Sequence, residues 1–182
     1  WSQAKKIIPG GNMFLSKRLN NDAIKDWPIY FSKSKDCYVW DLYKRKYVDL
    51  GLMGVGTNVL GFNNNKINKS VIKAIKFGNM SSLNSLEELR LAKLMIKLHK
   101  WADMAKFAKT GGEANALAIR IARAYTKTDK VAVCGYHGWH DWYLAANLKN
   151  KNSLKNHLSN NLKISGVPKA LKNTVFTFEY NN

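Results

Sequence analysis

The sequence is poor in cysteine and proline, and both shortages exclude classes of protein. Cys37 and Cys134 are its two cysteines in 182 residues, and they form no CxxC pair. This excludes a scaffold held by several disulfides and a four-cysteine zinc site within this chain, and it favours a reducing compartment. With three prolines and no Gly/Ser-rich linker, we expect one continuous unit.

Long apolar runs are also missing. No stretch approaches the roughly 18–20 consecutive apolar residues of a membrane-spanning helix. The first residues, WSQAKKIIPGG, lack the charged and apolar regions of a secretory signal. We therefore expect a cytoplasmic protein with no membrane partner. Because 46% of the residues are hydrophobic, the chain can fill a core and is not expected to be disordered.

Acidic residues are scarce: 12 stand against 30 basic ones, for a net charge of +18. Such a balance first suggests a nucleic acid or an anionic membrane as partner. However, only 5 of the basic residues are arginine, 20 residues are asparagine, and the lysines are spread through every segment. This pattern favours background composition, as an AT-rich coding sequence produces it, and we expect no specific nucleic-acid partner.

The two ends of the sequence do not resemble those of a finished domain. Trp1 is not an initiator methionine, and Tyr180 to Asn182 follow an apolar run directly. We therefore expect a fragment of a longer protein.

The first half of the chain contains strand, turn and helix patterns in that order. Alternating and β-branched residues predict a small antiparallel element from three strands, at 29–31, 38–40 and 46–50. A glycine-rich stretch, 51–61, precedes predicted helices at 66–77 and 86–98. The glycines do not form a dinucleotide fingerprint, because its third glycine would fall on Val59.

From residue 103 short apolar runs alternate with a helical pattern. We predict strands at 104–108, 130–134 and 174–178 and a helix at 113–125. Strand, helix and strand at this spacing predict a parallel sheet. The expected apolar face of the helix consists of Ala114, Leu117, Ala118, Ile121, Ala122 and Tyr125. The polar, lysine-rich residues 147–165 predict a long mobile loop.

The strongest local signal is the segment Lys109–Ala116, KTGGEANA, where a predicted strand gives way to a helix. Gly111 and Gly112 let the backbone approach a ligand, and the free amides at a helix start carry partial positive charge. This arrangement suits a phosphate group. A plain turn with a helix cap explains the same residues, so both interpretations stay open.

A second signal, CGYHGWHDWY at 134–143, follows the next predicted strand. Carboxyl ends of parallel strands share one edge of a sheet, so we expect this segment to meet Gly111 and Gly112. Cys134, His137, His140 and Asp141 could ligate a metal, but their spacing matches no common zinc motif. A flat aromatic cofactor stacked on Tyr136 explains the aromatic residues better, and core filling remains an alternative for the tryptophans.

With these two segments, the sequence resembles the class III aminotransferases, and within them the glutamate-1-semialdehyde 2,1-aminomutase branch. The resemblance extends over nearly the whole chain. Its motifs are Pro9–Gly11, Tyr38–Asp41, Tyr47–Asp49, Val59–Gly61, Lys109–Ala124, Tyr136–Asp141 and Gly166–Pro168. It implies an α/β fold, the fold-type I architecture of aspartate aminotransferase, with an incomplete parallel-type sheet and a small N-terminal α+β element. Residues 1–65 would belong to the small domain and 66–182 to the first part of the large, cofactor-binding domain.

The resemblance also implies a cofactor and the residues that bind it. The cofactor would be pyridoxal 5'-phosphate, with its phosphate on the amides of Gly111 and Gly112 and its ring on Tyr136. His137 and Gly138 would shape that wall. The family often carries serine or threonine at the position of Gly112, so one hydroxyl is missing here and Thr110 is the candidate to replace it. The lysine that bonds to the cofactor and the aspartate that pairs with its ring nitrogen would lie beyond residue 182, and no metal site is implied.

The implied activity is transfer of an amino group from a small-molecule donor to an aldehyde or ketone, in a homodimeric enzyme. Glutamate-1-semialdehyde 2,1-aminomutase activity, which forms 5-aminolevulinate, is the alternative. Val55 and Gly56 lie in the segment that is similar to the family's substrate-pocket frame. Val55 stands where the aminomutases usually have tryptophan, which favours transamination. The fragment alone is expected to be inactive, and residues 147–165 correspond to the aminomutases' mobile gate.

A non-catalytic, basic nucleic-acid-binding module is the remote alternative. It is suggested by the net charge of +18 and by the aromatic residues between Tyr136 and Tyr143. A groove that stacks single-stranded bases combines aromatic with basic side chains, and this run contains no lysine or arginine.

Overall fold

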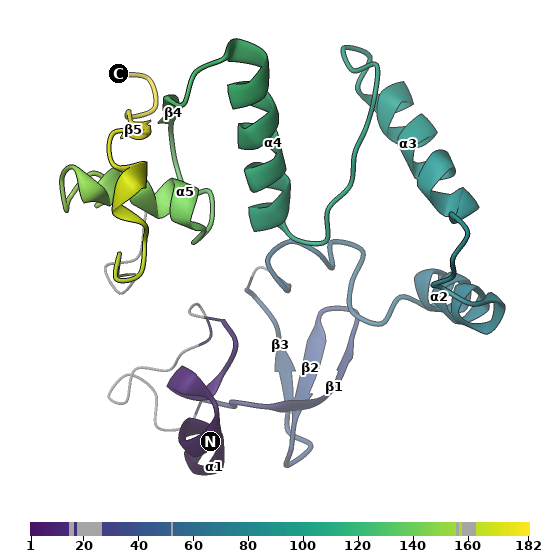
Figure 1. Cartoon of the computed structure of the whole chain (residues 1–182). Coiled ribbons are helices and arrows are strands. Elements are labelled where there is room, and N and C mark those ends of the chain that lie inside the picture. Colours follow the sequence, from purple (N-terminus) through teal and green to yellow (C-terminus); the bar gives the residue numbers. More distant parts are fainter. Residues whose placement is uncertain (15–16, 18–26, 52, 156, 158–162) are drawn as a thin grey trace. The chain divides into compact units, whose positions relative to one another are not determined.

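The computed structural model describes residues 1–14, 17, 27–51, 53–155, 157 and 163–182 (Figure 1). The chain divides into two compact units, Trp1–Ser85 and Leu86–Asn182. No helix among the described residues has the length and apolar character needed to cross a membrane.

The first unit contains the predicted antiparallel element. Strands β1 (Phe31–Lys35), β2 (Tyr38–Asp41) and β3 (Lys46–Val48) pair in that order (Figure 1). The predicted bounds of two strands were wrong, because β1 begins at Phe31 and β3 ends at Val48. Asp36, at a φ of 52°, turns the chain so that Lys35 pairs with Tyr38. Because of this pairing, the polar run Ser-Lys-Ser-Lys forms part of β1, although its side chains do not show the alternation of apolar and polar residues that predicts a strand.

Asp41 fastens the connection between β2 and β3. Its side chain is 3% exposed and accepts hydrogen bonds from the amides of Tyr43 and Arg45, at 2.8 and 2.9 Å. It also accepts from Arg45 Nε at 2.7 Å and from the Tyr47 hydroxyl at 3.1 Å. Burial raises the pKa of Asp41, but these hydrogen bonds and the charge of Arg45 outweigh it, so the pKa is lowered. The carboxylate therefore holds the turn in its ionised form.

The helices of the first unit are α1 (Ser2–Ile7), the 3₁₀ helix η1 (Pro9–Gly11) and α2 (Asn65–Phe77). Helix α2 confirms the pattern predicted at 66–77. The side chain of Asn64 accepts hydrogen bonds from the amides of Lys66 and Ile67, which explains where the helix begins. Gly78, at a φ of 90°, ends it.

The second unit begins with helices α3 (Leu86–Leu98) and α4 (Gly111–Thr126). Strands β4 (Val131–Val133) and β5 (Val175–Thr177) follow and pair in parallel, with Val131 opposite Val175. Between them lie α5 (Asp141–Leu144) and the 3₁₀ helices η3 (Ala145–Leu148) and η4 (Lys169–Leu171). The predicted helices and the parallel pairing are confirmed.

The strand predicted at 104–108 was wrong. These residues form no strand, and among the described residues nothing pairs with them. A strand needs a neighbour to take up its backbone hydrogen bonds, and a five-residue apolar run cannot specify that neighbour.

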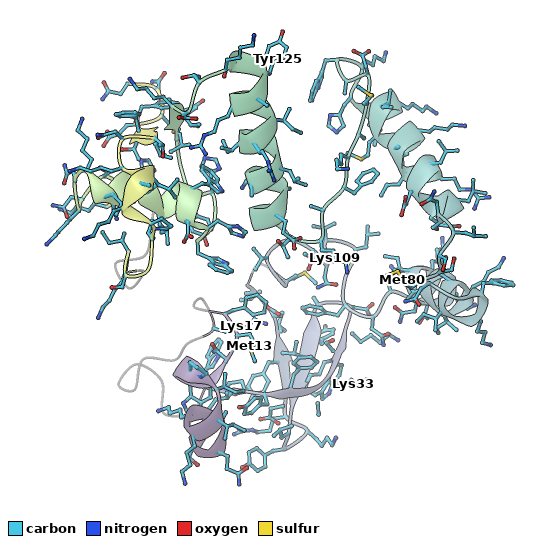
Figure 2. All side chains as sticks on the ribbon, viewed as in Figure 1. Met13, Lys17, Lys33, Met80, Lys109 and Tyr125 are labelled. Carbon is cyan, nitrogen blue, oxygen red and sulfur yellow. The ribbon has the colours of Figure 1, made fainter. Side chains whose placement is uncertain are left out.

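The core of the second unit lies around α5, η3 and the β4–β5 pair. Its buried members are Val133, Trp142, Tyr143, Leu144, Ala145, Ala146, Leu154, Val167 and Val175. Helix α4 packs on this core through Ala116 and Ile119. The apolar stripe that predicted the helix is not the one that packs on this core, since Ile121 is 61% and Tyr125 88% exposed. Figure 2 shows Tyr125 at the end of α4, away from the core. Periodicity gives the spacing of apolar positions, but not which stripe meets a partner.

The loop predicted at 147–165 is partly packed, so that prediction was wrong for its first half. Leu154 is 1% exposed, and its amide donates to Asn147 Oδ1 at 2.9 Å. The Thr177 hydroxyl donates to the carbonyl of Ser153 at 3.0 Å, which ties this segment to β5. Residues 156 and 158–162 lie outside the described residues, so the comparison with a mobile gate stays a prediction there.

Candidate functional site

Helix α4 begins in a capping box that takes up two of the four free amides at its start, those of Thr110 and Glu113. The Thr110 hydroxyl oxygen accepts from the amide of Glu113 at 3.2 Å. The Glu113 carboxylate in turn accepts from the amides of Lys109 and Thr110, at 3.1 and 3.0 Å. The cap fixes the direction in which the helix starts, in the region where Figure 2 labels Lys109.

Two amides are left over, those of Gly111 and Gly112. In the part of the chain that the structure describes, neither amide has an acceptor. A Cβ added to Gly111 would meet nothing within 4 Å, so the space beside it is open. The Thr110 oxygen accepts from Glu113 but keeps its own hydrogen to donate. Two parallel N–H groups at a helix start, with a hydroxyl next to them, suit an anion.

The segment after β4 meets this helix start. A Cβ added to Gly138 would lie 3.7 Å from the Cα of Gly112. The Asn115 side-chain amide donates to the carbonyl of His137 at 3.3 Å. Gly138 has a φ of 104°, a conformation that favours glycine. The structure therefore brings together the two segments that sequence analysis singled out.

A buried tyrosine holds the 134–138 turn in shape. Tyr143 is fully buried, and its hydroxyl donates to the carbonyl of Gly135 at 2.8 Å. Burial raises the pKa of the Tyr143 phenol, which keeps it protonated as a donor. The ring of His137 packs against Tyr143 at 5.8 Å, and its Nε2 lies 2.8 Å from the carbonyl of Cys134. His137 thus faces inward and supports the turn.

Tyr136 faces the opposite way. It is 60% exposed and touches Tyr143 edge to face, with ring centroids 6.2 Å apart. This contact leaves most of the Tyr136 ring free to stack on a flat ligand.

Core filling and metal binding were the competing interpretations of the segment 134–143, and the structure answers them residue by residue. Core filling holds for Trp142, which is 9% exposed, but not for Trp139, which is 66% exposed. Among the described residues, no group of three or more histidine, cysteine, aspartate and glutamate side chains could hold a metal ion.

Val55 and Gly56, the candidate substrate-pocket residues, belong to the first unit. Both have positive φ values, 59° for Val55 and 76° for Gly56, within a series of turns from 53 to 60. A β-branched residue in this conformation is strained. Val55 is 75% exposed, so its side chain is available for contact.

Two residues of the site were missed or misassigned. Asn115 was not singled out, although a polar side chain one turn into an apolar helix was a usable signal. His140 was weighed only as a metal ligand, but its ring lies against Gly112. No pattern in the sequence could reveal that contact, because it joins residues from two separate elements.

Comparison with known proteins gives one family. Residues 20–182 match the family described as aminotransferase class-III. A 3-aminobutyryl-CoA aminotransferase of Cloacimonas acidaminovorans is 32% identical over 183 residues, covering 100% of this chain and 40% of the relative. A glutamate-1-semialdehyde 2,1-aminomutase of Wigglesworthia glossinidia brevipalpis is 33% identical over 187 residues, covering 99% of this chain and 40% of the relative.

Solved structures agree on the fold. An omega-transaminase from Sphaerobacter thermophilus superposes with a TM-score of 0.80 at 22% identity, covering 100% of this chain and 41% of that protein. The FumI protein of Sphingopyxis sp. MTA144 gives 0.79 at 23% identity, covering 100% and 39%. The expected fold-type I architecture is confirmed, and the chain spans about two fifths of the length of its relatives. Together with the match over residues 20–182, this establishes that the chain belongs to the class III aminotransferase family.

Proposed function

We propose that the complete protein binds pyridoxal 5'-phosphate and transfers an amino group from a small-molecule donor to the aldehyde or ketone of a small metabolite. The observation that carries this proposal is the pair of amides at Gly111 and Gly112, which have no acceptor among the described residues and lie next to a turn that presents an exposed aromatic ring. Family membership supplies the chemistry that such a site would serve.

The residues at this site fit the cofactor. The amides of Gly111 and Gly112 and the hydroxyl of Thr110 would hold the phosphate, which needs several converging donors. Tyr136 would stack on the ring, while His137 and Gly138 would shape the wall beside it. Pyridoxal phosphate supplies the electron sink for amino-group chemistry, and the protein orients it.

The candidate residues for substrate binding, Val55 and Gly56, lie in the first unit. Val55 stands where the aminomutases usually have tryptophan, which favours a transaminase with a separate amino donor. Several similar relatives are glutamate-1-semialdehyde 2,1-aminomutases, at 30–33% identity, so this activity is the second candidate.

The decisive experiment uses the purified full-length protein. Titration with pyridoxal phosphate and with pyridoxal should show much tighter binding of the phosphorylated form. Equal affinities would contradict the proposal. Incubation with glutamate-1-semialdehyde alone then separates the two activities, because only the aminomutase turns over without a second donor. Salt-sensitive binding of single-stranded nucleic acid that weakens in Trp139→Ala would favour the binding-module alternative instead.

Three broader features belong to the same proposal. Residues 1–65 would form part of a small domain and residues 66–182 the beginning of the cofactor-binding domain. The complete enzyme would be a homodimer, and it would work in the cytoplasm. Cys37 and Cys134 are both free thiols, which is compatible with a reducing compartment. No lysine among these 182 residues is assigned the covalent bond to the cofactor, so we expect no turnover from this segment alone.

A further inference from the structure

Gly112 has no side chain, and the imidazole of His140 occupies the space that a side chain would take. A Cβ built on Gly112 would lie 2.7 Å from His140 Nε2 and 2.9 Å from Cδ2. Atoms cannot approach so closely, so any side chain at 112 would push the ring aside. The glycine at 112 therefore leaves room for an imidazole ring beside the first turn of α4.

The backbone around His140 is held in place by hydrogen bonds, and its ring packs against a neighbouring aromatic side chain. The His140 carbonyl accepts from the amides of Tyr143 and Leu144, at 2.9 and 3.1 Å, at the start of α5. The ring packs against Trp139 with centroids 5.0 Å apart and is half-buried. In the residues that the structure describes, no hydrogen bond reaches either ring nitrogen. A polar ring that is fixed, half-buried and unpaired is suited to a ligand.

The charges around this ring favour an anion. His140 lines a groove along α4 together with Lys109, Arg120 and Glu113. Glu113 is the single acidic group of that set, and its carboxylate is already occupied by the amides of Lys109 and Thr110. The lining also contains the side chains of Lys109 and Arg120, so its net charge is positive.

We infer that the imidazole of His140 donates a hydrogen bond to the phosphate group, beside the amides of Gly111 and Gly112. This inference rests on the proposed function, since the phosphate is that of pyridoxal phosphate. In this arrangement His140 supplies the side-chain hydrogen bond to the phosphate that Gly112, which has no side chain, cannot supply. Histidine and glycine then act as a pair, because the ring reaches the phosphate only while residue 112 lacks a side chain.

The test measures how strongly the phosphate contributes to binding. For the full-length protein, dissociation constants for pyridoxal phosphate and pyridoxal are obtained by absorbance titration. The constant for pyridoxal divided by that for pyridoxal phosphate gives the ratio that is compared between variants. In His140→Ala we expect weaker binding of pyridoxal phosphate by roughly tenfold, the loss of one charge-assisted hydrogen bond, with pyridoxal unaffected. His99→Ala is the matched control, because this histidine is exposed at the end of α3.

Two more variants keep the inference testable if His140→Ala does not fold. Gly112→Ala should reduce the ratio similarly, since its methyl group displaces the ring. Gly112→Ser combined with His140→Ala should restore much of the ratio, because the new hydroxyl replaces the imidazole donor.

An unchanged ratio in His140→Ala and Gly112→Ala would overturn the inference, as would an equal loss of affinity for both ligands. A wild-type protein that binds both ligands equally would instead refute the proposed function.

Discussion

Replacement of Gly111 by proline isolates a single backbone N–H group. Gly111 is the first residue of α4, and proline is well tolerated there, because that position has no intrahelical hydrogen bond to lose. The preceding residue, Thr110, has a φ of −127° and a ψ of 155°, in the extended region that a following proline requires. Gly111→Pro should therefore remove one phosphate donor without breaking the helix.

The expected size of the effect follows from the type of hydrogen bond. An N–H group that donates to a phosphate contributes about 1.5–3 kcal/mol. Its loss corresponds to a dissociation constant for pyridoxal phosphate that is about ten- to a hundredfold higher. Gly111→Ala is the matched control: it keeps the N–H, and its Cβ would meet nothing within 4 Å. We expect the alanine variant to bind within about twofold of the wild type.

The assay is an absorbance titration with pyridoxal phosphate, accompanied by thermal unfolding of both variants. Comparable melting temperatures establish that the proline variant is folded. If Gly111→Pro then binds the cofactor as tightly as Gly111→Ala, the amide of Gly111 is not a phosphate donor, and the reasoning from the helix start fails.

Three further predictions concern the fold. Tyr143→Phe leaves the buried carbonyl of Gly135 without its donor and should lower the free energy of unfolding by about 1–3 kcal/mol in urea titration, whereas Tyr125→Phe, at an exposed site, should change little. Leu154→Ala should cost about 2–5 kcal/mol because the side chain is 1% exposed, and a loss no larger than that of Leu98→Ala would mean that 150–155 is not packed. Asp41→Asn should lower the melting temperature at neutral pH. Because folding lowers the pKa of Asp41, the difference in melting temperature between wild type and variant should persist above the unfolded pKa of about 3.9 and vanish as the pH falls through the pKa of the folded state. If the melting temperature of Asp41→Asn lies below that of the wild type by the same amount at all pH values, the carboxylate charge is not involved.

Local chemistry made much of the site predictable. The segment Lys109–Ala116 predicted either a phosphate-binding helix start or a plain cap. The cap is present, and among the described residues the amides of Gly111 and Gly112 have no acceptor. These features depend on neighbours within a few residues, which the sequence places directly. The aromatic run at 136–143 was identified in the same way, but the sequence did not show which of its side chains are buried and which are exposed.

Long-range contacts account for the errors. Residues 104–108, predicted as a strand, have no pairing partner in the part of the chain that the structure describes, and α4 packs through Ala116 and Ile119 rather than through its more apolar stripe. Leu154 is buried although its neighbours are polar, because Asn147 and Thr177 hold that segment against the core. In each case the deciding residue lies outside the window in which a pattern can be recognised.

By itself, the sequence determined the family, the two segments of the site and the positions of the helices α2, α3 and α4, because motifs and periodicity are local properties. Tertiary structure decided which face of α4 is buried, that Tyr136 faces outward while His137 faces inward, and that His140 lies over Gly112. These outcomes depend on packing between α4, α5 and the turn after β4, where space and hydrogen-bond partners are shared among elements distant in sequence.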